Sequence, residues 1–377
     1  MKDNGCRIID SVSQIERKDW DNLLGGHPEG YQFYELLESS RLKEFKFYYL
    51  LLYKAGSISL IAPLFVGDLN LYIAVSGLAK RLILLIRKVL PRFMILKTLF
   101  CGSPFGEYGV IGVREDTEEK ADLIERLSAE IKGFCKDERI SLTLFKDFPE
   151  KETLSLDRLL ALGFFRLESF PAAKAQLNFS SFEGYLKSLS RSTRKGLRRK
   201  IKEANSAFKI EVKEAHNIEG MVDDIYRLYL NTYHQGQTKF EALTKEFFLN
   251  AARAMEPHTR YFLYYVNGAL AAFNLCFIYP DLFIDKFIGF DYNITKQANL
   301  YFISWCHNVE WCLRQGIQFY QVGQTDYAAK ARLGAKLEPL YAYLRHSNGF
   351  MNLALRLLAV FLRPKHSESR LKEGDAV

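Results

Sequence analysis

Residues 316–346 read GIQFYQVGQTDYAAKARLGAKLEPLYAYLRH. The stretch opens with a β-prone run at 317–322, which Gly323 ends. A second β-prone run, at 337–345, closes it. Short apolar runs bounded by glycine are typical of strands. The stretch therefore predicts two strands with a short crossover between them.

The crossover carries the pattern G-x-x-x-Y-x-x-K, formed by Gly323, Tyr327 and Lys330. At the helical spacing i and i+3, the tyrosine and the lysine share one face. A crossover at a strand end is where α/β proteins usually place ligands. A lysine there holds a phosphate or carboxylate as a point charge, and a tyrosine hydroxyl donates to an oxyanion or relays a proton. We therefore take Tyr327 and Lys330 as candidate catalytic residues; the alternative is that Lys330 and Arg332 are solvated surface charges.

Length and composition set the broad class of the protein. A chain of 377 residues predicts two domains or one large one, and its formal net charge of +8 favours anionic partners. The six cysteines form no C-x-x-C pair and the seven histidines form no H-E-x-x-H spacing, so we predict reduced thiols and no metal site. No apolar signal-peptide core and no run of about 18 apolar residues is visible in the sequence. We therefore expect a cytoplasmic protein.

The predicted elements follow the same order in both halves of the chain. A capping box of Ser13 and Glu16 predicts the start of the first helix. The first half is predicted to hold helices at 13–25 and 31–42, strands at 47–53, 58–66 and 69–75, a helix at 116–135, a strand at 140–145, a helix at 153–162 and a strand at 164–170. The second half is predicted to hold helices at 218–232 and 244–255, strands at 261–266, 269–278 and 282–289, and a helix at 299–315 before the opening stretch.

This repeated order predicts the fold class α+β, with two tandem domains, each a mixed and mostly antiparallel sheet flanked by helices. We expect the boundary near Phe170-Pro171. The predicted domains are therefore 1–170 and 171–349, followed by an amphipathic segment and a polar tail at 350–377.

Two further segments, 79–100 and 350–363, combine many apolar residues with arginine and lysine. The first has six basic residues and no acidic one. That composition is typical of a segment that lies on a membrane surface; the alternative is a buried helix whose basic side chains reach outward. We therefore predict peripheral membrane contact through both segments, at the inner face of the cell membrane.

A third segment, 180–205, is predicted to be helical and strongly basic. Ser180 and Glu183 form a capping box, and seven cations fall within residues 191–202 with no acid among them. Like charges at this density repel one another unless an anion is near. The residues predicted to bind an anionic ligand are Arg194, Lys195, Arg198, Arg199 and, from the crossover, Arg332. The alternatives are a solvated helix face or a nucleic-acid contact without a recognised motif.

The second half resembles the acetyltransferase-like domain of the CelD type, a branch of the GNAT superfamily related to the Fem peptidoglycan aminoacyltransferases. Four motifs between 180 and 346 carry the resemblance: L-x-x-L-S-R-x-x-R-K-x-L-R-R at 186–199, G-A-L-A-A-F-N-L at 268–275, F-D-Y-N-I-T-K-Q-A-N at 290–299, and G-x-x-x-Y-x-x-K with R-L-G-A at 323–335. The first half shares the order of elements, and its run F-C-G-S-P-F-G-E-Y-G at 100–109 is similar to a glycine-rich active-site loop of such proteins. We expect the first domain to be a degenerate copy.

The resemblance implies transfer of an acyl group from a thioester or an aminoacyl ester to an amine, within a sheet that splays around a cleft. It implies that the donor's pyrophosphate lies at a helix N-terminus, which here assigns Lys296, Gln297, Ala298 and Asn299 to the donor. This loop departs from the family pattern because it lacks glycines and because Asp291 repels phosphate. The resemblance implies acyl-CoA as the expected co-substrate, with no permanently bound cofactor, and aminoacyl-tRNA is the alternative donor.

The reaction also needs a group that accepts the proton of the attacking amine. Asp285 and Asp291, which flank the predicted strand at 282–289, are the candidates for this role. Asp326 is a further candidate catalytic residue, because it lies beside Tyr327 and Lys330 at the crossover. Asp285 lies in an apolar strand next to Lys286, and adjacent strand residues point to opposite faces, so the two do not simply pair; a structural salt bridge is the alternative for Asp285. We expect an N-acyltransferase acting on a small-molecule or lipid-linked glycan precursor of the cell envelope. The alternatives are a Fem-like aminoacyltransferase that uses aminoacyl-tRNA, and a non-catalytic module that binds an anionic glycan or lipid.

Overall fold

The computed structural model describes residues 5–71, 77–114, 117–236 and 242–361. These residues divide into two compact units. Unit 1 consists of residues 5–38, 43–171 and 339–361, and unit 2 consists of residues 39–42 and 172–338. Apart from the four residues 39–42, the chain passes from unit 1 to unit 2 between Pro171 and Ala172, and it returns to unit 1 at Pro339.

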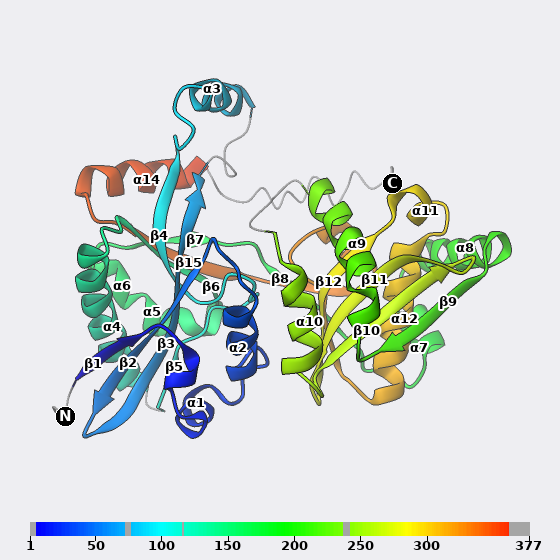
Figure 1. Ribbon diagram of the computed structural model, residues 1–377, viewed down its shortest axis with the longest axis horizontal. Helices are drawn as coiled ribbons and strands as arrows, with labels where there is room; N and C mark the ends of the chain where they lie inside the picture. Colours follow the sequence, from blue (N-terminus) through cyan, green and yellow to red (C-terminus); the bar gives the residue numbers. More distant parts are fainter. Residues whose placement is uncertain (1–4, 72–76, 115–116, 237–241, 362–377) are drawn as a thin grey trace. The chain divides into compact units, whose positions relative to one another are not determined.

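Unit 1 is built on a mixed sheet in the strand order β1-β2-β3-β4-β6-β15-β7, with β5 paired to β3 (Figure 1). Its strands are β1 (Cys6–Ile9), β2 (Lys46–Lys54), β3 (Ser57–Asn70), β4 (Ile95–Cys101), β5 (Gly112–Val113), β6 (Leu142–Pro149), β7 (Phe165–Glu168) and β15 (Leu340–His346). Its helices are η1 (Val12–Gln14), α1 (Arg17–Leu24), α2 (Tyr31–Ser39), α3 (Gly77–Arg87), α4 (Thr117–Asp137), α5 (Glu150–Leu156), α6 (Arg158–Ala161) and α14 (Gly349–Phe361).

Unit 2 is built on a second mixed sheet, in the order β14-β8-β13-β12-β11-β10-β9. Its strands are β8 (Ala172–Gln176), β9 (Ile210–Ala215), β10 (Thr259–Val266), β11 (Ala269–Ile278), β12 (Leu282–Phe290), β13 (Phe319–Gln321) and β14 (Ala335–Glu338). Its helices are α7 (Phe182–Ser188), α8 (Arg191–Ala207), η3 (Glu219–Met221), α9 (Val222–Gln235), α10 (Lys245–Ala254), α11 (Tyr292–Thr295), α12 (Leu300–Gln315) and α13 (Tyr327–Arg332). The predicted fold class is therefore confirmed.

Helices cover both faces of each sheet, because successive strand residues point to opposite faces and both faces are apolar. In unit 1, Leu50 of β2 and Ile124 of α4 belong to the core on one face. On the other face, Trp20 of α1 packs against Tyr34 and Tyr49.

In unit 2, α12 covers one face of the sheet, where Trp311 packs against Phe262 and Phe283. Helices α9 and α10 cover the opposite face, where Phe248 packs against Phe273. The sheet is thus buried on both sides, and a polar residue on its α12 face must find its partners within the fold.

Both sheets contain one parallel pair of strands joined by a long helix. In unit 1, β4 pairs with β6 in parallel from Thr98↔Leu142 to Cys101↔Phe145, across α4. In unit 2, β12 pairs with β13 in parallel across α12. This shared arrangement is the structural form of the repeat that the order of elements predicts.

The run at 337–345, which was predicted to be one strand, belongs to two strands. Pro339 separates β14, which pairs with β8 in unit 2, from β15, which lies between β6 and β7 in unit 1. A proline cannot donate a ladder hydrogen bond, so the strand ends there and the chain changes sheets. Unit 1 therefore includes residues that the sequence assigned to the second domain.

Three other boundaries differ from their predictions. Glu16, not Ser13, occupies the N-cap position of α1, and Ser13 lies in the short helix η1. The strands predicted at 58–66 and 69–75 form one strand, β3, because Gly67 and Asp68 remain paired with β4; residues 72–75 lie outside the described residues. The helix predicted at 153–162 is divided at Asp157 into α5 and α6.

Candidate active site

The two parallel strands of unit 2 separate after a short region of pairing. Pairing runs from Leu282↔Phe319 to Ile284↔Gln321 and then ends. Beyond β13 the chain stays paired with β8, because Val322 donates its backbone N–H to the carbonyl of Ala173 over 2.9 Å. Asp285 is therefore the first residue of β12 beyond the point where the strands separate. We call this region the fork of unit 2.

A β-bulge follows at once. Cys276 of β11 faces Asp285 while Leu275 faces Phe287, so Lys286 is the extra residue. A bulge reverses the alternation of side chains along a strand. Phe283 therefore packs against Trp311 on the α12 face, whereas Phe287 packs against Phe247 of α10 on the other face.

The carboxylate of Asp285 is held by neutral donors. Asn274 donates to its Oδ1 over 2.5 Å, and the Tyr320 hydroxyl donates to its Oδ2 over 3.0 Å. Asn308 of α12 donates to both of these partners, at 2.6 and 3.0 Å. The side chains of Asn274 and Asn308 are completely buried, and such a satisfied buried network fixes the orientation of its members.

Asp285 is itself partly buried, and its electrostatics follow from that position. Burial raises the pKa of the Asp285 carboxyl, while the hydrogen bonds from Asn274 and Tyr320 and the charge of Lys330 oppose the rise. No ion pair within 4 Å involves Asp285 among the described residues. The carboxylate is thus a stronger base than an exposed aspartate.

Lys330, predicted from the crossover, points into the fold. Its residue surface is 6% exposed, and its ammonium donates to the carbonyl of Gly323 over 3.3 Å. The helix α13 that carries it is fixed at its C-terminal end, because the buried hydroxyl of Tyr185 donates to Leu333 over 2.9 Å. Lys330 is therefore not a solvated surface charge, and its charge acts on Asp285.

The other crossover residues are more exposed. Tyr327 is the first residue of α13 and packs, partly buried, against the core of unit 2. Asp326 occupies the N-cap position in the left-handed region, with φ of 50°, and its side chain is exposed. Arg332 is also exposed, and its Nε donates to Ala328 over 3.4 Å.

Sequence reasoning missed Tyr301 of α12. Its hydroxyl is buried and has no hydrogen-bond partner in the described part of the chain. Burial, with smaller contributions from the carboxylates of Asp326 and Asp285, raises the pKa of Tyr301. The hydroxyl therefore stays protonated at neutral pH and is near both acids. It belongs to an apolar helix, so no local pattern marks it.

The four residues assigned to the donor lie between α11 and α12. Lys296 and Gln297 are exposed, whereas Ala298 is completely buried. Asn299 adopts the left-handed conformation with φ of 50° before α12, and its amide donates to Lys200 of α8 over 3.4 Å. The loop therefore offers two exposed side chains and the backbone of a helix N-terminus. No group of His, Cys, Asp and Glu able to hold a metal occurs in the described ranges.

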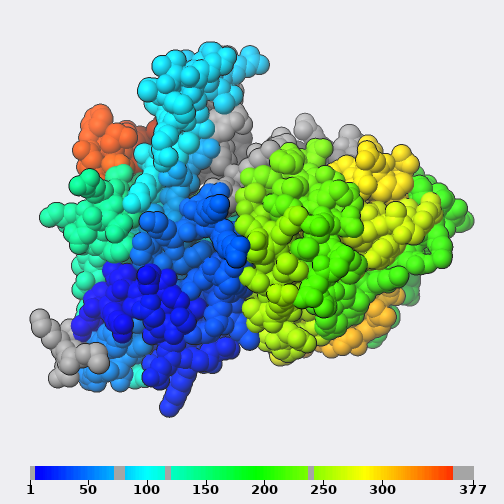
Figure 2. All heavy atoms as spheres, viewed as in Figure 1, coloured from blue at the N-terminus to red at the C-terminus, as the bar shows by residue number. Residues whose placement is uncertain are grey.

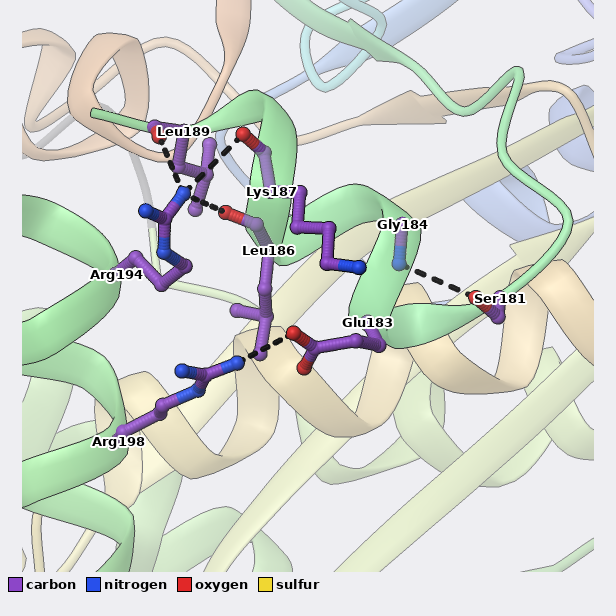
Figure 3. A network of polar contacts seen from close by, with 8 residues as sticks. All are labelled: Ser181, Glu183, Gly184, Leu186, Lys187, Leu189, Arg194 and Arg198. Atoms are coloured by element: carbon purple, nitrogen blue, oxygen red, sulfur yellow. Dashed lines mark hydrogen bonds and ion pairs between the residues drawn. The ribbon is translucent and has the colours of Figure 1, made fainter. Parts of the chain in front are cut away.

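The basic segment forms α8, but Arg194 has a structural role. Its guanidinium donates to the carbonyls of Leu186, Lys187 and Leu189 at 3.5, 3.2 and 3.4 Å, so it satisfies the C-terminal end of α7 (Figure 3). A cation at this end also complements the helix dipole. These bonds give Arg194 a structural role, and its contact with an anionic ligand stays a prediction.

Acidic residues also pair with two other members of the set. Arg198 lies 2.5 Å from Glu183 of α7 (Figure 3), and Arg199 lies 3.7 Å from Glu203 one turn along α8. The predicted capping box is displaced too, because Ser181, not Ser180, caps α7. Glu183 is thereby left to neutralise Arg198, which reduces the predicted repulsion.

Lys195 is exposed and makes no ion pair with the described residues. The same is true of its neighbours on α8, Arg191 and Lys202. The structure therefore leaves a smaller cationic face on α8 than the sequence predicts.

The corresponding fork of unit 1 is occupied by its own loop. Gly109 donates its backbone N–H to Asp147 of β6 over 2.8 Å. Lys146 donates to the carbonyls of Ser103 and Gly106 at 3.0 and 3.2 Å and lies 2.5 Å from Asp147. A Cβ on Gly109 would lie 2.2 Å from the Lys146 carbonyl, so the glycines of 100–109 serve this close packing.

One surface depression of unit 2, of about 530 Å³, lies elsewhere. Its lining, which includes Leu177, Asn178, Leu313 and Gln318, contains no titratable side chain. Catalysis of proton transfer requires such groups, so this depression does not supply a proton acceptor. A second depression of unit 2, of about 410 Å³, contains Glu214, His258 and Arg260 in its lining.

The two-sheet architecture, with a forked parallel pair in each sheet, is the fold of tandem GNAT-like proteins. The chain belongs to the FemAB-like family, described as peptidoglycan biosynthesis/recognition, whose pattern matches residues 98–347 and thus more than half of the chain. It is accordingly an acyl- or aminoacyltransferase. The comparison with curated proteins found no match.

Solved structures support the fold. FemX superposes with a TM-score of 0.57 at 13% identity, over 93% of this chain and 99% of FemX. A tandem GNAT protein from the clavulanic acid biosynthesis pathway gives 0.52 at 10% identity, over 91% and 99% of the two chains. L-PGS from Bacillus licheniformis gives 0.50 at 11% identity, over 89% and 97%. At these identities the similarity concerns the fold.

Proposed function

We propose that unit 2 transfers an acyl group from an activated donor to an amine of a cell-envelope precursor, at the fork between β12 and β13. The observation that carries this proposal is the position of Asp285. Its carboxylate is fixed by Asn274 and Tyr320, has a raised pKa, and lies at the point where the strands separate, under the influence of Lys330.

The chemistry follows from these groups. An alkyl amine has a pKa of about 10 and is protonated at neutral pH, so it must lose a proton before it attacks. That first proton goes to solvent, and Asp285 accepts the second proton, which the nitrogen loses as it attacks, directly or through one water. The amine nitrogen then forms a bond to the acyl carbon, and the bond from that carbon to the thioester sulfur or ester oxygen breaks. Tyr301, protonated because it is buried, supplies a proton to the leaving group and is reprotonated from Asp285 or solvent.

Lys330 supplies positive charge in a setting with little water. An ammonium in such an environment stabilises negative charge on the carbonyl oxygen more strongly than it would in water. Its bond to Gly323 restricts its position, which favours a preorganised electrostatic role. Tyr327 adds a hydroxyl on the same helix.

Two donors remain in competition. Acyl-CoA fits the helix N-terminus at Leu300, where free backbone N–H groups bind phosphate. The expected acceptor is then acylated at an amine of a small-molecule or lipid-linked glycan precursor. Aminoacyl-tRNA is favoured by membership of the FemAB-like family and by the exposed cations Arg191, Lys195 and Lys202 of α8.

The test is product formation on a defined acceptor. The protein is incubated with a lysine-containing peptidoglycan precursor pentapeptide and either acetyl-CoA or alanyl-tRNA, and the acceptor's mass is measured. A mass increase with either donor supports transfer, and its size identifies the donor. An unchanged acceptor with both donors, when the same preparation binds the pentapeptide in calorimetry, overturns the proposal.

A further inference from the structure

Helix α14 of unit 1 is apolar on two opposite faces. Leu355 and Ala359, one turn apart, are buried and belong to a small core cluster with Phe165 and Leu344. On the opposite side, Phe350 is 79% exposed and Leu357 is 60% exposed, with Leu353 between them at helical spacing. A helix that is apolar all round is normally covered on all sides.

Helix α3 and the turn after it have the same property. Ile83 is buried, whereas Leu82 and Leu85 are each 59% exposed. The apolar surface continues into the turn, where Val89 is 81% exposed. Figure 2 shows the atoms of this segment, in cyan, projecting from the surface of unit 1.

The two helices belong to the same end of unit 1. Leu69 and Leu71, which lead into the α3 segment, and Leu96, which leads out of it, pack against the cluster that contains Leu355 and Ala359. Figure 1 draws α3 and α14 at this end of the sheet. We call the exposed apolar residues of α3, of the turn after it and of α14 the apolar end of unit 1.

The charge at the apolar end is positive. The sequence contains no acidic residue between Asp68 and Glu107, and none between 349 and 361. Arg81 and Lys88 of the α3 segment are exposed and make no ion pair within the described residues. Arg92 does pair, with Asp68 at 2.8 Å. Exposed leucines with lysine and arginine among them are the chemistry that a lipid interface with anionic headgroups accepts.

We propose that the apolar end of unit 1 docks on the surface of an anionic lipid bilayer, with the exposed leucines of α3 and α14 among the acyl chains and Arg81 and Lys88 at the headgroups. The contact is superficial: none of the described helices is long and apolar enough to cross a bilayer. A second copy of the chain is a poorer occupant, because a two-fold contact presents the same patch from both sides and brings these cations together. The inference does not depend on the transfer reaction.

The test uses co-sedimentation of the full chain with vesicles. One set is phosphatidylcholine alone, and the other contains roughly 30% phosphatidylglycerol, the headgroup charge that attracts basic segments. We expect the wild type to sediment with the anionic vesicles and about tenfold more weakly with the neutral ones. Leu85→Glu with Leu353→Glu should abolish sedimentation, and Arg81→Gln with Lys88→Gln should remove most of the preference for the anionic set.

The matched control is Leu154→Glu with Leu160→Glu. These leucines are exposed on α5 and α6 of the same unit, so the control makes the same chemical change outside the apolar end. Sedimentation should be retained by the control. The proposal is overturned if the control variant loses sedimentation as fully as Leu85→Glu with Leu353→Glu. It is also overturned if the wild type sediments with neither set of vesicles. So does a wild-type dimer in light scattering that Leu85→Glu with Leu353→Glu converts to monomer.

Discussion

Replacement of Asp285 by asparagine separates the chemical role of this residue from its structural one. Asparagine has nearly the same shape and keeps one carbonyl oxygen to accept from Asn274. Its new amide group faces the Tyr320 hydroxyl, which can accept as well as donate. Because Asn308 also donates to Tyr320, the Tyr320 O–H loses its acceptor. The other hydrogen bonds of the network are kept, while the base is lost. General-base catalysis contributes about 10²–10⁴-fold, so turnover should fall by that factor, equivalent to about 3–5 kcal/mol.

Although Asp285→Asn should lower turnover, it should not lower the stability of the protein. Charge-assisted hydrogen bonds contribute about 1.5–3 kcal/mol and neutral ones about 0.5–1.5 kcal/mol, so the variant loses roughly 1–2 kcal/mol from the network. The cost of burying a carboxylate disappears at the same time. Because the environment raises the pKa of Asp285 overall, the second effect is the larger one. We expect a melting temperature equal to or above that of the wild type at pH 7.

The pH dependence of the melting temperature tests whether the pKa of Asp285 is raised or lowered by folding. The folded wild type holds the Asp285 proton more tightly than the unfolded chain. The tighter binding of this proton therefore stabilises the folded wild type fully below the usual aspartate pKa of about 3.9. That stabilisation is lost as the pH rises through the pKa of Asp285 in the folded protein. The melting temperature of Asp285→Asn relative to wild type, followed by calorimetry, should rise from about pH 4 toward neutrality. A relative melting temperature that falls over this range would refute the assignment of a raised pKa.

Three further predictions concern unit 2. Lys330→Gln should lower turnover about tenfold or more. Because the ammonium opposes the rise of the Asp285 pKa, this change should also move the acidic limb of the pH–rate profile to higher pH. Lys330→Arg should return the limb most of the way to its wild-type pH, and a limb that does not move in Lys330→Gln would contradict the coupling. Tyr327→Phe should reduce turnover by an order of magnitude with an unchanged melting temperature, measured beside Tyr327→Ala; if the phenylalanine variant is fully active and the alanine variant unfolds, the tyrosine serves packing alone. A triple variant with glutamine at Arg191, Lys195 and Lys202 should bind an anionic donor more weakly, with a flatter salt dependence and unchanged stability. Arg194→Ala should instead lower the melting temperature, because three carbonyls at the end of α7 lose their donor. Weaker donor binding in Arg194→Ala, together with a lower melting temperature in the triple variant, would contradict the assignment of Arg194 to structure and of the other three cations to binding.

The sequence allowed the regular parts of the fold to be predicted because they depend on local patterns. The asparagine-glycine turn at 267–268 has both residues at positive φ, at 51° and 86°, as a tight hairpin turn requires. Thr244 caps α10 by accepting from Phe247. Lys330 became a candidate because it lies three residues after a tyrosine beyond a predicted strand end, and the structure shows that it is buried; its role in catalysis stays a prediction.

What the sequence concealed depends on pairing between distant segments. The change of sheet at Pro339 and the position of β8 between β13 and β14 follow from tertiary partners, which no local pattern reports. Asn274, Asn308 and Tyr301 lie in strongly apolar elements, where single polar residues carry no periodic signal. The acids that neutralise α8 were hidden for the same reason, because Glu183 reaches Arg198 across two helices.

The most direct test of the account compares the two forks in one reaction. Asp147 of unit 1 is the matched residue for this purpose: it is buried on β6, accepts from Ser169 and pairs with Lys146. The acylated pentapeptide would be measured by mass spectrometry for the wild type, Asp285→Asn and Asp147→Asn, each first shown to be folded by circular dichroism. We predict product from the wild type and from Asp147→Asn, and about 10²-fold less or none from Asp285→Asn. Full activity of Asp285→Asn together with loss in Asp147→Asn would place the chemistry in unit 1 and contradict the account.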